Sequence, residues 1–268
     1  MIIQGTTLTG TVINDGLVTN GLQLYLDTRN PRSWSGNGTT WYDLSPNAKH
    51  ATFYKDLGSG SGSSEGTIID GSTIFNNGYG DLRFDGTSGS GLYQYAAGPN
   101  LGTGITQFTV NTWFWIRTMP TLSGTTYPCL LTTNYTGTPN TVNFAFVIGN
   151  PGNNTQDQKL YGGFFDTSSG SPAWHLATGY TFSATTWYHA CMTYDGTILT
   201  IYINGTSNTT LSYASSTMTQ TLGYRVGRRW DNYETIDGYI PVMMVYNRAL
   251  NSSEVNQIFN YHRGRYGV

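Results

Sequence analysis

The segment 187–205 constrains the fold of this chain more than any other. It contains two strand-like runs, WYHACMTY at 187–194 and TILTIYIN at 197–204, followed respectively by Asp195-Gly196 and Asn204-Gly205. Asp-Gly and Asn-Gly tolerate the positive φ angles of tight hairpin turns, so the segment predicts strand, turn, strand, turn. The second run alternates, with Leu199, Ile201 and Ile203 on one face and Thr200, Tyr202 and Asn204 on the other. One face of this hairpin is therefore expected to cover a core.

Similar short runs recur along the whole chain. They are rich in β-branched and aromatic residues and are separated by Gly, Asn, Asp and Ser, which is typical of antiparallel strands joined by turns. Further strands are predicted at 22–27, 108–117, 142–148, 160–165, 224–227 and 239–247. Pro241 indicates an edge position or a bulge in the last of these. Roughly a dozen strands fit the chain at a mean of about 5 to 6 residues each.

One helix is predicted near the C-terminus. Asn251 can cap it and Glu254 occupies the third helical position, while Leu250 and Val255 can form a hydrophobic staple. The face predicted to be buried consists of Val255, Ile258, Phe259 and His262. Gly264 is expected to end the helix.

The fold class that follows is all-β, with one short C-terminal helix. Aromatic residues make up 14% of the chain, which argues against disorder. We expect a single domain over residues 21–268, preceded by an N-terminal arm or extra strand over 1–20. The GSGSGSS run at 58–64 has the composition of a surface loop.

Composition and charge exclude several classes of protein. Thirteen basic and fifteen acidic residues give a formal charge of −2, so we expect no nucleic-acid partner. No apolar run approaches the roughly 20 residues of a membrane-spanning helix. The first ten residues lack the basic and apolar regions of a secretory signal, and the two cysteines, Cys129 and Cys191, cannot form a multi-bridge framework. We therefore expect folding in a reducing compartment.

Several segments together resemble a known family. They are GLQLYLDTRNPRSWSGNGTTWYDLSPNAKHAT at 21–52, DLRFDGTSGSGL at 81–92, FTVNTWFWIR at 108–117, WYHACMTYDGTILTIYING at 187–205 and the segment 224–268. Over about residue 21 to the C-terminus the chain resembles the concanavalin A-like lectin and glucanase superfamily, in its laminin-G-like branch. The resemblance implies two antiparallel sheets packed as a jelly-roll sandwich.

The end of the chain carries a narrower resemblance. YNRAL, SSEVNQIFN and RGRYG are similar to segments of virion components of tailed bacteriophages. This implies a non-enzymatic structural subunit of a phage particle, either a capsid decoration or cement protein or a tail appendage. It would be made in the host cytoplasm and located in the virion, with other virion proteins as partners and as a homo-oligomer or capsid-bound subunit. Many relatives carry an acidic pair before YNRAL, whereas Pro241 and Val242 stand here.

Catalytic residues are not evident. Retaining glycosidases need two carboxylates about 5 to 5.5 Å apart. The glutamates are Glu65, Glu234 and Glu254, and no predicted strand places two of them on one face. Asp81 and Asp85 are the best remaining pair, although a strand ending in a turn also explains FDG. We therefore expect no enzyme, and a glycan hydrolase using Asp81 or Asp85 with Glu234 stays as an alternative.

Nucleophilic and cofactor chemistry are also disfavoured. His189 and Cys191 lie two apart on a predicted strand, hence on one face, but no acid flanks either of them, so buried structural roles are expected. No group of His and Cys has the spacing of a zinc site, and no GxxxxGK[ST] motif occurs. We expect no organic cofactor.

Calcium is a possible metal ligand of this chain. Members of the family hold it with Asp side chains and loop carbonyls, and the segment WDNYETID offers Asp231, Asn232, Glu234 and Asp237. A solvated loop without metal is the alternative, because the spacing is not that of an EF-hand.

Three aromatic residues are candidates for surface contacts. Trp174, Trp230 and Tyr233 each lie beside polar residues in predicted loops, where they could stack on sugar rings or contact another subunit. Trp113 and Trp187 lie on predicted strands and are expected in the core. A carbohydrate-binding, lectin-like module is therefore the main alternative to the virion role, and surface glycans are its expected partners.

Overall fold

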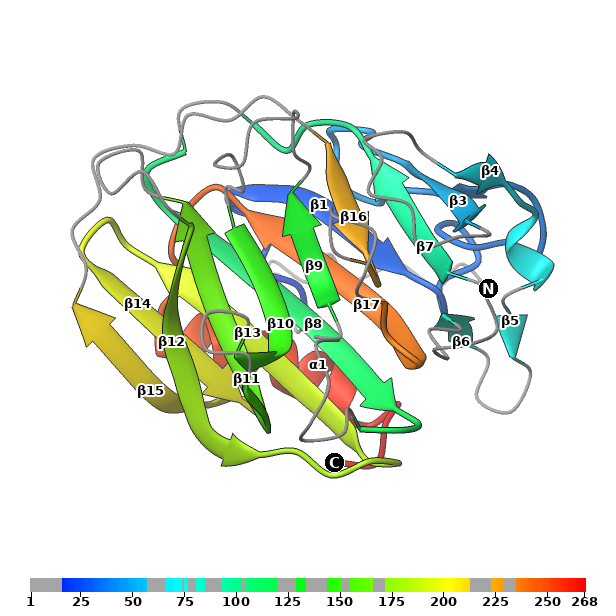
Figure 1. Ribbon diagram of the computed structural model, residues 1–268. Coiled ribbons are helices and arrows are strands. Elements are labelled where there is room, and N and C mark those ends of the chain that lie inside the picture. The colour runs from blue at the N-terminus through cyan, green and yellow to red at the C-terminus, as the bar shows by residue number, and fades with distance from the viewer. Residues whose placement is uncertain are drawn as a thin grey trace, which may run out of the picture.

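Two antiparallel sheets stacked face to face form the framework of the protein (Figure 1). The structure, a computed structural model, describes residues 16–56, 66–73, 75–76, 81–84, 93–102, 105–119, 129–133, 144–150, 155–165, 172–212, 223–228 and 235–268. The predicted all-β sandwich with one short helix is confirmed. The predicted loop at 58–64 lies outside the described residues.

The first sheet has eight strands. Its order is β15 (Thr206–Ser212), β14 (Ile198–Ile203), β13 (Trp187–Tyr194), β8 (Phe108–Ile116), β17 (Gly238–Tyr246), β6 (Asp81–Phe84) and β5 (Phe75–Asn76). The strand β1 (Leu22–Asp27) pairs with the other half of β17, from Val242 to Tyr246.

The second sheet has nine strands and faces the viewer in Figure 1. Its order is β12 (Pro172–Thr181), β11 (Thr155–Phe165), β10 (Phe144–Asn150), β9 (Cys129–Thr133), β16 (Tyr224–Val226), β7 (Tyr93–Gly98), β3 (Ala51–Asp56) and β2 (Thr40–Trp41). The short strand β4 (Thr67–Ile68) also pairs with β3, and a 3₁₀ turn, η1, spans Gly71–Thr73.

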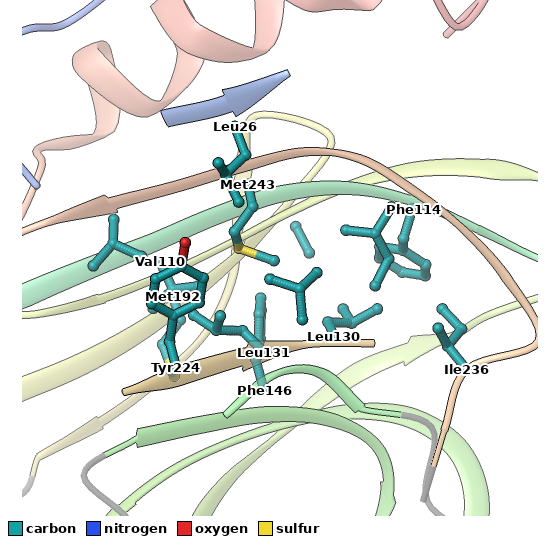
Figure 2. Packing of buried hydrophobic residues seen from close by; sticks show 14 of the residues in the cluster. Leu26, Val110, Phe114, Leu130, Leu131, Phe146, Met192, Tyr224, Ile236 and Met243 are labelled. Atoms are coloured by element: carbon teal, nitrogen blue, oxygen red, sulfur yellow. The ribbon is translucent and has the colours of Figure 1, made fainter. Parts of the chain in front are cut away.

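The main hydrophobic core lies between the two sheets. Figure 2 shows Leu26, Val110, Met243 and Met192 of the first sheet meeting Leu130, Leu131, Phe146 and Tyr224 of the second. All of these side chains are fully buried. Alternate residues of each strand point into this layer, so their neighbours in sequence point to one of two outer faces.

The hairpin at 187–205 is confirmed. β13 and β14 pair from Ala190↔Ile203 to Tyr194↔Leu199, and Asn204 and Gly205 both have positive φ, as an Asn-Gly hairpin turn requires. The first turn is wider than two residues: the Asp195 carboxylate accepts hydrogen bonds from the backbone N–H groups of Thr197 and Ile198. The second strand therefore begins at Ile198.

Pro241 lies in β17, which runs between β8 on one side and β6 and β1 on the other. The pairing with β8 shifts register between Tyr239 and Val242, and the Pro241 carbonyl accepts a hydrogen bond from the backbone of Thr28. The bulge alternative for Pro241 is therefore right and the edge alternative is wrong. A bulge accommodates a residue that cannot donate to the ladder.

The helix α1 spans Ser252–Arg263 and covers the outer face of the eight-stranded sheet, behind it in Figure 1. The predicted capping box is present, with the Asn251 side chain accepting from the Glu254 N–H and the Glu254 carboxylate accepting from the Asn251 N–H. Gly264 is the C-cap, and the buried face is the predicted one. Local capping signals were sufficient for this element.

The described end of the predicted N-terminal arm, residues 16–20, lies against the same side of the protein. The Val18 carbonyl accepts a hydrogen bond from the Tyr246 hydroxyl, and the Asn20 carbonyl accepts from Arg248 Nε. Val18 is buried in the cluster beneath α1. Residues 16–20 are thus packed against the first sheet and helix, and residues 1–15 lie outside the described residues.

Candidate functional site

A row of apolar and aromatic side chains crosses the outer face of the nine-stranded sheet. Tyr54 on β3 pairs in register with Ile68 on β4 and with Tyr95 on β7. Phe53 and Ala96, the neighbours of Tyr54 and Tyr95, lie in the core between the sheets, so the two tyrosines point outward. Their rings stack with centroids 5.4 Å apart and planes inclined by 17°. We call Ile68, Tyr54 and Tyr95 the tyrosine row.

Exposure falls steadily across the tyrosine row. Ile68 is 55% exposed, Tyr54 is half-buried and Tyr95 is fully buried. Ile68 is one of five large hydrophobic side chains that are exposed in the described part of the chain. The outer end of the row therefore presents apolar surface to solvent.

Tyr95 is fixed from several directions. Its hydroxyl accepts a hydrogen bond from the Gly66 N–H at 2.8 Å. The guanidinium groups of Arg225 and Arg228 lie 5.2 and 4.9 Å from the centre of its ring, within cation–π range. Both arginines are buried. The ring against which Tyr54 stacks is thus immobilised, and the tyrosine row is preorganised.

The predicted contact residues Trp230 and Tyr233 belong to the segment 229–234, which follows Arg228 and lies outside the described residues. An isolated bridge pairs Arg228 with Thr235, so the two ends of that segment meet beside the tyrosine row. The backbone of Trp174 lies in β12, on the opposite edge of the same sheet. Four strand spacings separate β12 from β16, about 19 Å at about 4.8 Å each. The backbone of Trp174 is therefore far from the strand that precedes Arg228.

Of the predicted metal ligands, Asp231, Asn232 and Glu234 lie outside the described residues. Asp237 is described and buried. One of its carboxylate oxygens accepts a hydrogen bond from Arg83 at 3.2 Å and the other accepts from Arg117 at 2.9 Å. Two guanidinium groups thus already balance the negative charge of this carboxylate. In the described ranges no three His, Cys, Asp or Glu side chains gather as a metal site requires.

Asp81, the described member of the possible catalytic pair, is fully buried; Asp85 lies outside the described residues. Asp81 accepts hydrogen bonds from Thr28 Oγ1 and from Nε and Nη2 of Arg29, at 2.8 to 3.0 Å. Burial raises the pKa of the Asp81 carboxyl, and the Arg29 guanidinium opposes that shift. The geometry makes Asp81 a fixed partner of Arg29 in the protein interior.

A second buried carboxylate, Asp27, lies nearby and holds the end of the chain. It accepts hydrogen bonds from Arg265 Nη1 at 2.6 Å and from the Tyr25 hydroxyl at 2.9 Å. Arg29 in turn donates to the Arg265 carbonyl, and its guanidinium lies 4.5 Å from the centre of the Tyr266 ring. Asp27 and Asp81 therefore anchor the C-terminal segment to strands β1 and β6.

His189 and Cys191 share one face of β13, as predicted, and both are fully buried beneath α1. His189 Nε2 lies 2.8 Å from Asn111 Nδ2, and Nδ1 accepts from the Gly205 N–H. Burial lowers the pKa of His189 to about 3, and burial raises the pKa of the Cys191 thiol to about 12. Neither group is accessible at this position.

Trp113 and Trp187 are buried against Tyr266, so their expected core positions are confirmed. The tyrosine row, in contrast, was not among the predicted contacts. A signal for part of it exists in the segment ATFYKD at 51–56, where Ala51 and Phe53 alternate with Thr52 and Tyr54. The pairing with Ile68 and Tyr95 is long-range, and no local pattern encodes it.

A family model described as the concanavalin A-like lectin and glucanase superfamily matches residues 85–256, which is more than half of the chain. The protein belongs to this superfamily. The resemblance of its segments to that superfamily is thus confirmed. A search of curated protein sequences finds no significant match. The described residues include no helix that is long and apolar enough to cross a membrane.

Solved structures share the fold at low sequence identity. Domain 4 of an extracellular arabinanase from Geobacillus stearothermophilus, solved with arabinotriose, has a TM-score of 0.57 and 18% identity, covering 90% of this chain and 99% of that domain. The binding domain of botulinum neurotoxin DC, solved with SialylT, has a TM-score of 0.58 and 11% identity. The sialidase of Trypanosoma rangeli, solved with the inhibitor DANA, has a TM-score of 0.55 and 16% identity.

The extent of these matches differs. The chain spans nearly the whole arabinanase domain, but it covers 51% of the toxin binding domain and 33% of the sialidase, with 91% of its own length aligned in each. At these identities the similarity establishes a shared sandwich fold. The ligands bound in those structures describe those proteins and do not identify a ligand of this chain.

Proposed function

We propose that this protein is a non-catalytic carbohydrate-binding module that contacts a sugar through the tyrosine row. The observation that carries the proposal is the Tyr54–Tyr95 stack, fixed by two arginines and continued by the exposed Ile68. The half-buried Tyr54 ring, held against the fixed Tyr95 and continued by the exposed Ile68, suits the apolar face of a sugar ring. Trp230 and Tyr233, which lie outside the described residues, remain proposed contacts.

The choice of face has a physical basis. The one α-helix of the described residues packs on the other sheet, where the space above the strands is filled by Val255, Ile258, Phe259 and Tyr266. A ligand on that face would have to displace the protein's own core. Two of the similar folds were solved with carbohydrate, arabinotriose and SialylT, which supports a sugar as the ligand class.

The state of the acidic side chains supports a non-catalytic role. Every carboxylate whose side chain the structure describes is a fixed hydrogen-bond acceptor: Asp27, Asp81, Asp237 and Glu254 accept from arginines, and Asp43, Asp70 and Asp195 accept from backbone N–H groups of their own turns. Glycoside hydrolysis needs one carboxyl that donates a proton and another that attacks or activates water. Carboxylates fixed in this way suit neither role, and the hydrolase with Asp81 or Asp85 and Glu234 stands as the weaker alternative.

The experiment is a glycan array followed by titration calorimetry with the strongest ligand. Tyr54→Ala should lower affinity about two- to tenfold, the range of one aromatic contact. Tyr261→Ala is the matched control, because Tyr261 is an exposed tyrosine on α1, on the opposite face. Equal affinity of wild type and Tyr54→Ala would contradict the site. Release of reducing sugar from the bound glycan would contradict the non-catalytic role.

We also propose that the module is a subunit of a bacteriophage particle, a decoration, cement or tail-appendage protein located in the virion. The observation in its favour is the resemblance of YNRAL, SSEVNQIFN and RGRYG to virion components. The same residues have structural tasks here, since Arg248 pairs with Glu254 and Arg265 pairs with Asp27. Mass spectrometry of purified particles decides the location: the chain should be enriched in particles, and its presence only in the particle-free fraction would contradict this proposal.

A further inference from the structure

A second aromatic pair lies on the same outer face, at the start of β3. Trp41 and Ala51 pair in register and both point into the core. Their neighbours Tyr42 and His50 therefore project to the outer face. The two rings meet edge to face, with centroids 5.1 Å apart, and Tyr42 is 46% exposed. Two of the five exposed large hydrophobic side chains of the described chain, Tyr42 and Ile68, thus share this face.

The loop between Tyr42 and His50 is built around the buried carboxylate of Asp43. One oxygen accepts from the N–H groups of Tyr25 and Ser45, and the other accepts from the Ser45 hydroxyl and the Lys49 N–H, all at 2.7 to 2.8 Å. Four hydrogen bonds to one carboxylate hold the loop in a single conformation and tie it to β1. Tyr42 and His50 are therefore presented by a rigid support.

The hydrogen bond that His50 accepts determines which of its ring nitrogens can donate to a ligand. Its Nδ1 accepts a hydrogen bond from the Asp43 N–H at 3.0 Å, and a backbone N–H can only donate. In the neutral ring the proton therefore sits on Nε2. Tyr42 thus supplies an apolar ring face and His50 an adjacent N–H donor, the two kinds of contact that a sugar ring requires.

The distance between the two aromatic positions sets the size of the ligand. His50 and Tyr54 are four residues apart, about 13 Å along an extended backbone. Between them on this face lies Thr52, a half-buried neutral side chain, and Thr40 pairs with Thr52 in register. One sugar ring cannot reach both ends, whereas a linear oligosaccharide can. The uncharged Tyr42, Thr52 and Tyr54 favour a neutral chain over an acidic one.

On the basis of the proposed carbohydrate binding, we infer that the ligand is a neutral linear oligosaccharide that runs along β3 from the tyrosine row to a second subsite made by Tyr42 and His50. Affinity then depends on chain length. A short sugar contacts the tyrosine row alone, and a longer one gains the contact with Tyr42 and the hydrogen bond from His50.

The test is calorimetry with linear arabino-oligosaccharides and gluco-oligosaccharides, from the monosaccharide to the hexasaccharide. Wild type should gain about two- to tenfold in affinity as the chain becomes long enough to span both ends. Tyr42→Ala and His50→Ala should remove this gain while leaving the affinity for the shortest bound sugar unchanged. Tyr54→Ala should lower affinity at every length, and Tyr261→Ala, with the wild-type profile, is the exposed-tyrosine control.

The outcomes separate this inference from the proposed function. If wild type binds and Tyr42→Ala keeps the full gain with length, the second subsite is wrong and carbohydrate binding stands. If wild type binds no oligosaccharide of any length, the proposed function and this inference both fall. The melting temperatures of the variants are measured alongside, and Tyr42→Ala should melt close to wild type because Tyr42 is largely exposed.

Discussion

The outer faces of the two sheets both carry aromatic side chains and arginines, but the two faces differ in what covers these side chains. On the eight-stranded sheet, Trp113 and Trp187 stack on Tyr266 of the C-terminal segment, and Arg265 of that segment pairs with Asp27. On the nine-stranded sheet, Tyr54 stacks on Tyr95, with arginine guanidinium groups beside the ring, and the row ends at the exposed Ile68. The first face binds the protein's own tail, whereas on the second the row runs from the buried Tyr95 through the half-buried Tyr54 to the exposed Ile68.

The difference shows that aromatic and arginine content alone does not mark a binding site in this fold. On the covered face the aromatic surface is already satisfied by α1 and residues 264–268. Two buried histidines, His189 and His262, also lie there, whereas His50 on the other face is only half-buried. The face under α1 should therefore respond to acid and to loss of its ion pair, and the tyrosine row to loss of ligand contacts.

The largest expected effect is acid destabilisation of the covered face. Burial lowers the pKa of His189 to about 3 and that of His262 to about 4. Each binds fewer protons when folded, so its stabilisation is complete above about pH 6.5 and is lost as pH falls toward the folded value. At about pH 5 each histidine should cost about 2 kcal/mol of unfolding free energy. Chemical denaturation at about pH 7 and pH 5 measures this.

A histidine variant separates this effect from general acid sensitivity. His262→Gln should reduce the loss between the two pH values by about half, because one of two titrating groups is gone. Hydrogen exchange at about pH 5 should rise in α1 before it rises in β3. An unchanged pH dependence in the variant would contradict the assignment.

The next effect is loss of the Asp27–Arg265 pair. Arg265→Ala leaves the buried Asp27 carboxylate without its guanidinium partner and should cost about 3 kcal/mol, lowering the melting temperature by about 6 to 10 °C. Arg263→Ala is the matched control, since Arg263 is exposed on the same segment and donates to the Val268 carbonyl. Similar melting temperatures for the two variants would show that the ion pair does not anchor the tail.

A smaller effect on stability is expected from removing the Tyr54 ring of the tyrosine row. Tyr54→Ala removes a half-buried ring and should cost about 1 kcal/mol, roughly the value of an aromatic pair. Its main consequence should be weaker glycan binding. A stability loss as large as that of Arg265→Ala would show that the tyrosine row is a structural core.

The smallest effect on stability is expected from breaking the Arg248–Glu254 ion pair, which connects the end of β17 to the start of α1. Arg248 donates to both oxygens of Glu254, and this interaction lowers the pKa of the Glu254 carboxyl. The pair is partly exposed, so Arg248→Ala should cost about 0.5 to 1 kcal/mol. Thermal denaturation should detect this as a fall in melting temperature of a few degrees at most. A larger fall would indicate that Arg248 also holds residues 16–20 in place through its hydrogen bond to the Asn20 carbonyl.

Much of the framework could be predicted from the sequence because its signals are local. The strands Leu22–Asp27 and Trp187–Tyr194 have the predicted bounds, and the capping box at Asn251 fixes the start of the helix. The strand number was underestimated: the structure describes seventeen strands where about a dozen were expected. Strands of two residues such as Thr40–Trp41 and Thr67–Ile68 are too short to show a period, and long-range pairing determines them.

The candidate site was less predictable. Trp174 was predicted in a loop, and this was wrong: its backbone lies in β12, at the far edge of the nine-stranded sheet, where it pairs with β11. Tyr54 and Tyr95 are forty-one positions apart in sequence, and register alone brings their rings together. Asp237 supplies a carboxylate to the WDNYETID segment, yet it is engaged by Arg83 and Arg117, which are more than 100 positions away in sequence. Contacts of this kind depend on the tertiary fold.

Hydrogen exchange with and without the bound oligosaccharide tests the central claim most directly. The account predicts that ligand slows exchange in β3, β4 and β7, around Tyr54, and leaves α1 and the C-terminal segment unchanged. Protection confined to α1 and residues 264–268, with none in β3, would contradict it.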